Sequence, residues 1–335
     1  MKFLIVCSSS GGHIYPGLAF SNFLKKVGEQ VKFLGIKNQI EERIIPSKDL
    51  ILIDIPKSFK NAIKHPLKTI AAKEEVNEII KDYDVIIGFG GFITFFVSTL
   101  KNCHNLYLHE ANVDIGDSNK YSLKKAKRIF TTFKITDNKK YHQKILYVGN
   151  PVCEDISTKK NNKNYICFIF GSLGSKTLLE KTICYLKQQN TNDKYLLVTS
   201  KKYYQYAKEK LINKENVLIK DVVKREDLYQ SAKILFCRGG ASTLMEGLAS
   251  RSYICAIPSP YVKHNHQERN VEYLYSHHAL QMIKEDNYSD DSIQRVIDYF
   301  KHSSFSILEK DNQKYFIKEH PSLNMYMQIK YDKNH

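Results

Sequence analysis

The 335-residue length predicts two domains rather than one, and a composition of 42% hydrophobic and 26% charged residues excludes a disordered chain. A formal net charge of +16 favours a polyanionic partner (nucleic acid, an anionic membrane surface or a phosphorylated substrate), although a lysine-rich surface serving only solubility gives the same charge. The seven cysteines include no CxxC pair, so they are expected to be reduced rather than to form a disulfide framework or zinc site.

In chain order, the first half alternates predicted strands with predicted helices. The apolar run KFLIV at 2–6, a helix from Gly17 to Val27 and a strand at 30–36 give a βαβ start, and a further helix opens at Pro66. Later strands are expected at 84–90, 105–110, 128–133 and 145–151. This alternation predicts an α/β fold with a mostly parallel sheet.

A polar segment, STKKNNKN at 157–164, precedes a second set of strands. These are expected at 165–171, 194–200, 217–222, 232–240 and 252–258. We therefore predict two doubly wound domains, an N-terminal one at 1–156 and a C-terminal one at 164–310. The tail at 311–335, which Pro321 interrupts, is a candidate helix expected to pack back toward the N-terminal domain.

Three glycine-rich loops follow predicted strands. In the first, Gly11 and Gly12 allow a tight turn before a helix whose unpaired N–H groups form an anion cradle. His13 lies at its mouth, where it could take a proton from a bound hydroxyl; a plain turn with a surface histidine is the alternative. The other loops are GFGGF at 88–92 and GSLGS at 171–175. Neither a GxGxxG fingerprint nor a Walker loop is present, so the loops favour two phosphate-bearing ligands across a cleft rather than NAD or ATP.

Polar side chains follow two further strands. The segment LHEANVDIGDSN, 108–119, carries a glutamate and two asparagines after an apolar strand. Glu246 is expected on a helix after Gly239-Gly240, where a carboxylate could bind a ribose diol; a charge on an exposed helix face is the alternative. The segment HNHQERN, 264–270, has two histidines but no evident carboxylate partner, so no metal site is predicted.

Taken together, these segments resemble the bacterial MurG glycosyltransferases of glycosyltransferase family 28. The similar segments are GGHIYPGLA (11–19), FLGIKNQIEERIIP (33–46), GFGGF (88–92), HEANVDIGDSN (109–119), VGNPV (148–152), GSLGSK (171–176), CRGGASTLMEGLA (237–249) and HQERN (266–270). The resemblance implies the GT-B fold, in which two Rossmann-like doubly wound domains are separated by a deep cleft. It also implies transfer of N-acetylglucosamine, with inversion, from UDP-N-acetylglucosamine (UDP-GlcNAc) to lipid I (undecaprenyl-pyrophosphoryl-MurNAc-pentapeptide), which forms lipid II in peptidoglycan biosynthesis.

The resemblance implies roles for individual residues. The acceptor diphosphate is expected at Ser10, Gly11, Gly12, Gly90, Gly91, Asn112 and Asn119. The donor UDP-GlcNAc is expected at Ser172, Gly174, Val222, Arg238, Glu246, Gln267 and Asn270. His13 is the first candidate for the catalytic base and Glu110 the second. No bound cofactor or metal ligand is implied, although a divalent cation could assist the acceptor diphosphate.

The chain departs from the family pattern at several positions. The family often has arginine where Cys153 follows Asn-Pro-Val, so this chain has one cation fewer at the expected donor site. It usually has glutamine where Ala111 stands, and FITFF at 92–96 is bulkier and more apolar than the family segment.

The implied acceptor is anchored by its lipid, so the resemblance places the chain peripherally on the cytoplasmic face of the cell membrane. No run of 18 apolar residues is present, and no spanning helix or signal peptide is predicted. Anionic lipid is expected to bind a basic, partly apolar patch. This patch comprises Phe59, Ile63, Lys57, Lys60, Lys64 and Lys68, with Phe92, Phe95 and Phe96 as an apolar rim. A core position for the phenylalanines is the alternative.

Two other functions remain open at the level of the sequence. The altered segment 92–96 and Cys153 allow a GT-B enzyme that glycosylates another lipid, such as diacylglycerol. A non-catalytic relative that binds a nucleotide sugar is the second alternative, and the joint presence of His13, Glu110 and Glu246 argues against it. A nucleic-acid partner is not expected, because no helix-turn-helix or RNP-like segment accompanies the positive charge.

Overall fold

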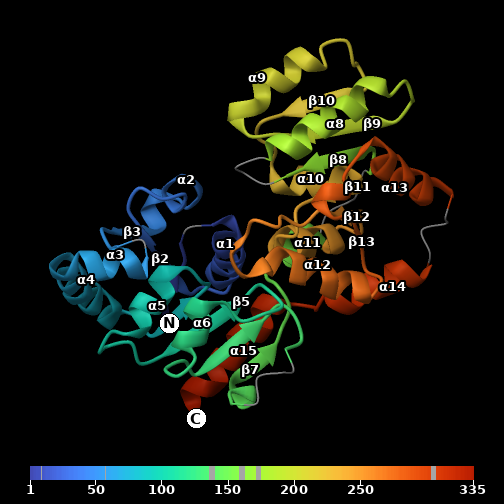
Figure 1. Ribbon diagram of the computed structural model, residues 1–335. Coiled ribbons are helices and arrows are strands. Elements are labelled where there is room, and N and C mark those ends of the chain that lie inside the picture. Colours follow the sequence, from blue (N-terminus) through green and yellow to red (C-terminus); the bar gives the residue numbers. More distant parts are fainter. Residues whose placement is uncertain (9, 57, 136–139, 158–162, 171–174, 303–306) are drawn as a thin grey trace. The chain divides into compact units, whose positions relative to one another are not determined.

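The computed structural model describes residues 1–8, 10–56, 58–135, 140–157, 163–170, 175–302 and 307–335 (Figure 1). They form two compact units, one of Met1–Val152 with Lys318–His335 and the other of Cys153–Ile317. Each unit is built on its own parallel sheet, so the α/β fold of two Rossmann-like domains predicted from the sequence is confirmed.

The N-terminal unit contains a seven-stranded sheet in the order β3-β2-β1-β4-β5-β6-β7. All of its pairings are parallel. Because the chain runs outward from β1 to β3 and then returns to β4, the switch point of the sheet lies between β1 and β4. The strands are β1 (Lys2–Val6), β2 (Gln30–Ile36), β3 (Leu50–Ile53), β4 (Val85–Gly88), β5 (Leu106–Glu110), β6 (Arg128–Thr131) and β7 (Ile145–Tyr147).

Helices cover both faces of this sheet, and β1 shows why. Its alternate side chains enter different cores: Phe3 and Ile5 pack with α1 (Gly11–Lys26) and α15 (Pro321–Asn334), while Leu4 and Val6 pack with α4 (Pro66–Ile79) and α5 (Phe92–Ser98). The helices of the unit are α1 (Gly11–Lys26), α2 (Glu41–Ile44), α3 (Phe59–Lys64), α4 (Pro66–Ile79), α5 (Phe92–Ser98), α6 (Asp117–Ser122) and α15 (Pro321–Asn334), with short 3₁₀ turns at Ser47–Asp49, Ile80–Asp82 and His142–Lys144.

The C-terminal helix α15 belongs to the N-terminal unit (Figure 1). Met325 and Ile329 are buried in the core shared with α1. Asp332 accepts hydrogen bonds from Nε and Nη2 of Arg128, at 2.9 and 2.8 Å, and Lys333 pairs with Asp84. The sequence placed the start of the returning tail at residue 311, whereas the units divide between Ile317 and Lys318 and α14 (Ile307–Phe316) stays in the C-terminal unit.

The C-terminal unit contains a six-stranded parallel sheet in the order β10-β9-β8-β11-β12-β13. Its core includes the stacked rings of Phe168 and Phe236, whose centroids lie 4.8 Å apart. The strands are β8 (Tyr165–Ile169), β9 (Lys194–Val198), β10 (Val217–Lys220), β11 (Ala232–Cys237), β12 (Tyr253–Ala256) and β13 (Gln281–Met282). The further helices are α7 (Val152–Ser157), α8 (Lys176–Gln188), α9 (Lys201–Lys210), α10 (Arg225–Ser231), α11 (Ala241–Ala249), α12 (His266–Ser276) and α13 (Asp290–His302), with 3₁₀ turns at Lys263–Asn265 and Glu285–Asn287.

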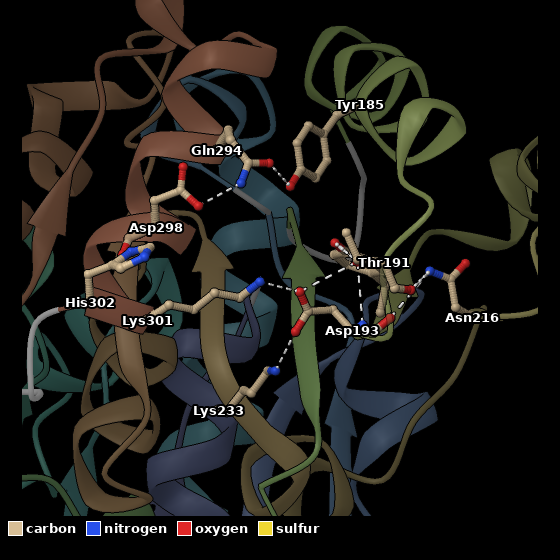
Figure 2. Close-up of polar contacts among 10 residues, drawn as sticks. Tyr185, Thr191, Asp193, Asn216, Lys233, Gln294, Asp298, Lys301 and His302 are labelled. Carbon is tan, nitrogen blue, oxygen red and sulfur yellow. Dashed lines mark hydrogen bonds and ion pairs between the residues drawn. The ribbon is translucent and has the colours of Figure 1, made fainter.

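A carboxylate joins three elements of this unit. Figure 2 shows Asp193, the residue before β9, between Lys233 of β11 and Lys301 of α13, whose ammonium groups donate hydrogen bonds of 2.8 and 2.6 Å. Burial would raise the pKa of Asp193, but the hydrogen bonds from the two lysines hold it below its ordinary value. The ion pairs therefore connect the amino-terminal edge of the sheet to a helix that is distant in sequence.

Candidate active site

His13 lies in the first turn of α1, at the carboxyl end of β1. The sequence predicted that this helix begins at Gly17. In the structure α1 begins at Gly11 and contains Pro16, so Gly11 and Gly12 are helical residues. The Nδ1 atom of His13 is 2.9 Å from the carbonyl oxygen of Ser8. A carbonyl oxygen can only accept, so Nδ1 carries the proton and Nε2 of the neutral ring is left as a proton acceptor.

The second glycine loop packs directly against the first. Gly90 has φ +107° and Gly91 φ +82°, a region that glycine adopts with little strain. A Cβ atom on Gly90 would lie 2.7 Å from Cδ2 of His13, and one on Gly91 would lie 2.6 Å from the hydroxyl of Ser8. Both positions thus require glycine, because of the positive φ and because a Cβ has no room. The structure brings together the two predicted acceptor loops.

Glu110, the second candidate base, ends β5 and is buried. Oε1 accepts from the backbone N–H and side-chain amide of Asn112, each at 3.0 Å, and Oε2 accepts from the N–H of Gly116 and from Asn119 at 2.9 Å. Four donors therefore occupy both oxygens. This arrangement fixes the 110–119 loop and makes Glu110 a weaker candidate than His13 for taking a proton from a ligand.

His109 follows an apolar strand in the sequence, but no role was predicted for it. Its ring is buried against Phe89, with centroids 5.0 Å apart, and burial lowers its pKa to about 4, with a smaller contribution from nearby His13. The ring is therefore neutral at pH 7 and places no charge beside His13. Its position directly before Glu110, at the end of an apolar strand, was the signal available in the sequence.

In the C-terminal unit, Glu246 lies in α11 and is buried. It forms an ion pair with Arg225, the first residue of α10. The sequence did not predict this partner, although Lys224 and Arg225 follow the end of a predicted strand, where ligand groups are expected in such folds.

Three other predicted donor residues, Arg238, Gln267 and Asn270, form contacts within the C-terminal unit itself. Arg238 donates to the carbonyl of Ile257 at 3.1 Å and forms a double ion pair with Glu285, at 2.7 and 3.2 Å. Gln267 accepts from the N–H of Ser259 at 3.1 Å, and buried Asn270 donates to the carbonyl of Gly239 at 3.2 Å. These contacts join the segment after β11 to α12, to the segment after β12 and to the 3₁₀ turn at Glu285–Asn287.

Two predicted donor residues, Ser172 and Gly174, lie outside the described residues. Val222 is 65% exposed, in the connection between β10 and α10. Within the described ranges, no group of three or more His, Cys, Asp or Glu side chains is arranged to hold a metal ion. No helix of the described chain is both apolar enough and long enough to span a bilayer.

Two family models match most of the chain. Residues 3–131 match the glycosyltransferase family 28 N-terminal domain, and residues 165–324 match the glycosyltransferase family 28 C-terminal domain. A relative from Buchnera aphidicola subsp. Acyrthosiphon pisum (strain 5A) is 30% identical and aligns over 92% of both chains. The chain belongs to glycosyltransferase family 28. The resemblance expected from the sequence motifs is confirmed.

Two relatives that align along most of their length carry the same name. The Buchnera relative is a UDP-N-acetylglucosamine--N-acetylmuramyl-(pentapeptide) pyrophosphoryl-undecaprenol N-acetylglucosamine transferase. A relative of the same name from Thermoanaerobacter sp. (strain X514) is 29% identical over 89% of this chain and 90% of its own.

Solved structures share the fold. The crystal structure of Acinetobacter baumannii MurG has a TM-score of 0.76 and 19% identity over 98% of this chain and 99% of its own. A UDP-GlcNAc 2-epimerase from Methanocaldococcus jannaschii has a TM-score of 0.60 and 13% identity, over 94% and 98%. Because an epimerase shares the fold, the fold alone does not identify the reaction.

Proposed function

We propose that this chain transfers N-acetylglucosamine, with inversion, from UDP-GlcNAc to lipid I and so forms lipid II. The observation that carries the proposal is that relatives named for this transfer align along about nine-tenths of the chain, including both family domains. The packing of the two glycine loops around His13 supports it, because a diphosphate acceptor needs backbone N–H groups beside a base. No resident cofactor or metal is part of the proposal.

The proposed reaction is a single in-line displacement. The acceptor hydroxyl attacks the anomeric carbon of the sugar, the bond from that carbon to the diphosphate oxygen breaks, and UDP leaves with the bonding electrons. Nε2 of His13 takes the hydroxyl proton. Ser8 supports this role by accepting from Nδ1–H, because that hydrogen bond selects the tautomer with a free Nε2.

The decisive experiment is a transfer assay with purified protein, UDP-GlcNAc and a short-chain lipid I analogue. The expected product is the lipid-linked disaccharide. A panel that includes diacylglycerol tests the alternative acceptor, and transfer to that lipid alone would refute the lipid I assignment. UDP binding in calorimetry without turnover on any acceptor would identify a non-catalytic relative.

We also propose that the protein docks reversibly on the cytoplasmic face of the cell membrane through α3 and α4. Ile63 and Leu67 are 80% and 82% exposed, and Ile70 is 55% exposed. Lys60 and Lys64 are exposed beside them, and Lys68 pairs with Asp54 at 2.7 Å. Basic residues close to anionic lipid contribute roughly 1 kcal/mol each, and the apolar side chains add burial.

The structure changes the composition of this patch. Leu67 and Ile70 join it, whereas Phe96 is 2% exposed and lies in the core, so it forms no part of the expected rim. Phe92 packs partly against the same core. Lys57 lies outside the described residues.

Vesicle sedimentation tests the docking patch. A variant with Ile63→Ser and Leu67→Ser is expected to lose most binding to anionic vesicles, because both side chains are exposed to solvent and available for burial in lipid. Ile212→Ser is the matched control, since Ile212 is equally exposed, at 80%, in the other unit. Equal binding of the native chain to neutral and anionic vesicles would contradict the electrostatic part of the proposal.

A further inference from the structure

In the C-terminal unit, two side chains from different helices meet away from bulk water. Nη2 of Arg225, in α10, forms an ion pair with Oε1 of Glu246, in α11, and the two side chains are 23% and 4% exposed. A carboxylate this buried requires a cation or several donors to offset the loss of hydration. Arg225 supplies that charge from a helix that precedes Glu246 in the chain.

A second observation places the same guanidinium near Cys153. The Sγ atom of Cys153 lies 3.6 Å from the carbonyl oxygen of Met245, the residue before Glu246. Burial, followed by Glu154, raises the pKa of the Cys153 thiol to about 12, and the charge of Arg225 opposes this rise. Arg225 therefore provides a cation close to the position where the sequence indicated that one was missing.

The connection between β10 and α10 links this pair to the expected nucleotide site. Val222, a predicted contact of the donor UDP-GlcNAc, is exposed in this connection and lies three residues before Arg225. The connection thus brings Val222 and Arg225 to the same end of the sheet. Arg225 supplies the cation for Glu246, the carboxylate predicted to bind the ribose.

We propose that Arg225 is a positioning residue of the donor site, which holds the Glu246 carboxylate in the orientation that accepts the two ribose hydroxyls. A carboxylate has about four lone-pair sites on two oxygens, and the contact that defines the ion pair runs from Nη2 of Arg225 to Oε1 of Glu246. The other oxygen can accept from a vicinal diol while Arg225 stays in place. This inference rests on the proposed function, because the diol is that of UDP-GlcNAc.

Calorimetry on the full chain with UDP and 2′-deoxy-UDP tests the inference. The native chain is expected to prefer UDP by about tenfold, since a ligand without the 2′-hydroxyl leaves the carboxylate less well satisfied. Arg225→Ala is expected to weaken UDP binding about tenfold or more and to bring the preference close to one. Lys224→Ala, which removes the same charge from an adjacent exposed position, is expected to change neither quantity.

A double-mutant cycle shows whether Arg225 acts through Glu246. In the Glu246→Gln background, Arg225→Ala is expected to cause no further loss of UDP affinity. This comparison also holds if Arg225→Ala alone does not fold, because the double variant leaves no lone buried carboxylate. Thermal unfolding of each variant reports its folding.

Four outcomes would overturn the inference: additive losses in the cycle or, in Arg225→Ala, an unchanged preference for UDP, an unchanged UDP affinity or tighter UDP binding. The last would mean that the ion pair blocks the carboxylate. If the native chain itself fails to bind UDP, the proposed function falls and takes the inference with it. If the native chain binds UDP and Arg225→Ala binds it equally, only the inference falls.

Discussion

At the scale of single residues, His13 and Glu110 have different surroundings although both are candidate bases. Nδ1 of His13 is hydrogen-bonded to the carbonyl of Ser8, and its ring lies beside Gly90, within the part of the chain that the structure describes. Glu110 accepts four hydrogen bonds from its own loop. A base must have a free lone pair where the proton leaves, so the geometry favours His13 for the chemistry and Glu110 for holding the loop.

Replacing His13 tests this assignment. His13→Ala is expected to lower the transfer rate about 10²–10⁴-fold, the usual contribution of a general base, while UDP affinity stays the same. The measurement is product formation at saturating donor and acceptor. His104→Ala, at an exposed histidine of the same unit, serves as the control. An unchanged rate in His13→Ala would remove His13 from the mechanism.

At the scale of elements, the site depends on how the start of α1 meets the loop after β4. Strands β1 and β4 are neighbours at the switch point of the sheet, so their carboxyl ends place the two glycine-rich segments in contact. The hydroxyl of Thr94, in α5, donates to the carbonyl of Gly90 at 2.9 Å and holds the second loop in its positive-φ conformation.

Gly90→Ala tests the loop contact. The added Cβ would lie within 3 Å of two ring atoms of His13, so the ring has to move, and the transfer rate is expected to fall about tenfold or more. Gly28→Ala is the matched control, because Gly28 has φ +83° with no atom within 4 Å of the added Cβ. Both variants strain the backbone by about 1–2 kcal/mol, and only Gly90→Ala displaces His13. Equal rates in the two variants would contradict the contact.

At the scale of the whole molecule, the C-terminal unit depends on Asp193 for part of its stability. Because its pKa is lowered in the folded state, its contribution is present above the ordinary aspartate pKa of about 3.9 and is lost as the pH falls through the folded-state pKa. Asp193→Asn is expected to lower the free energy of unfolding by about 1–3 kcal/mol at pH 7, and by progressively less below pH 4.

Urea unfolding at pH 7 and pH 3 measures this effect. Asp311→Asn is the control, since Asp311 forms an exposed pair with Lys314 in the same unit, and such pairs contribute about 0–1 kcal/mol. A loss for Asp193→Asn that is the same at both pH values would show that the ion pairs of Figure 2 are not its source.

The two-domain fold could be predicted because its strands are buried on both faces and are therefore continuous apolar runs, as in KFLIV at 2–6 and YICFI at 165–169. The positions of the two glycine-rich segments after β1 and β4 could be predicted because each follows a continuous apolar run; their acceptor role, and that of His13 as the base, stay predictions. The start of α1 was predicted too late, since Gly11 and Gly12 have low helix propensity and only the packing of the helix on the sheet overrides it.

The sequence by itself determined the fold class, the family and the glycine-rich segments around His13, because each depends on local patterns that a linear chain displays. Only the tertiary structure decided that Glu110 is engaged by its own loop, that Arg225 pairs with Glu246, and that the returning C-terminal segment begins at Lys318 rather than at residue 311. The physical reason is that hydrogen bonds and ion pairs between distant residues depend on distance and direction in space. No local pattern along the chain specifies either.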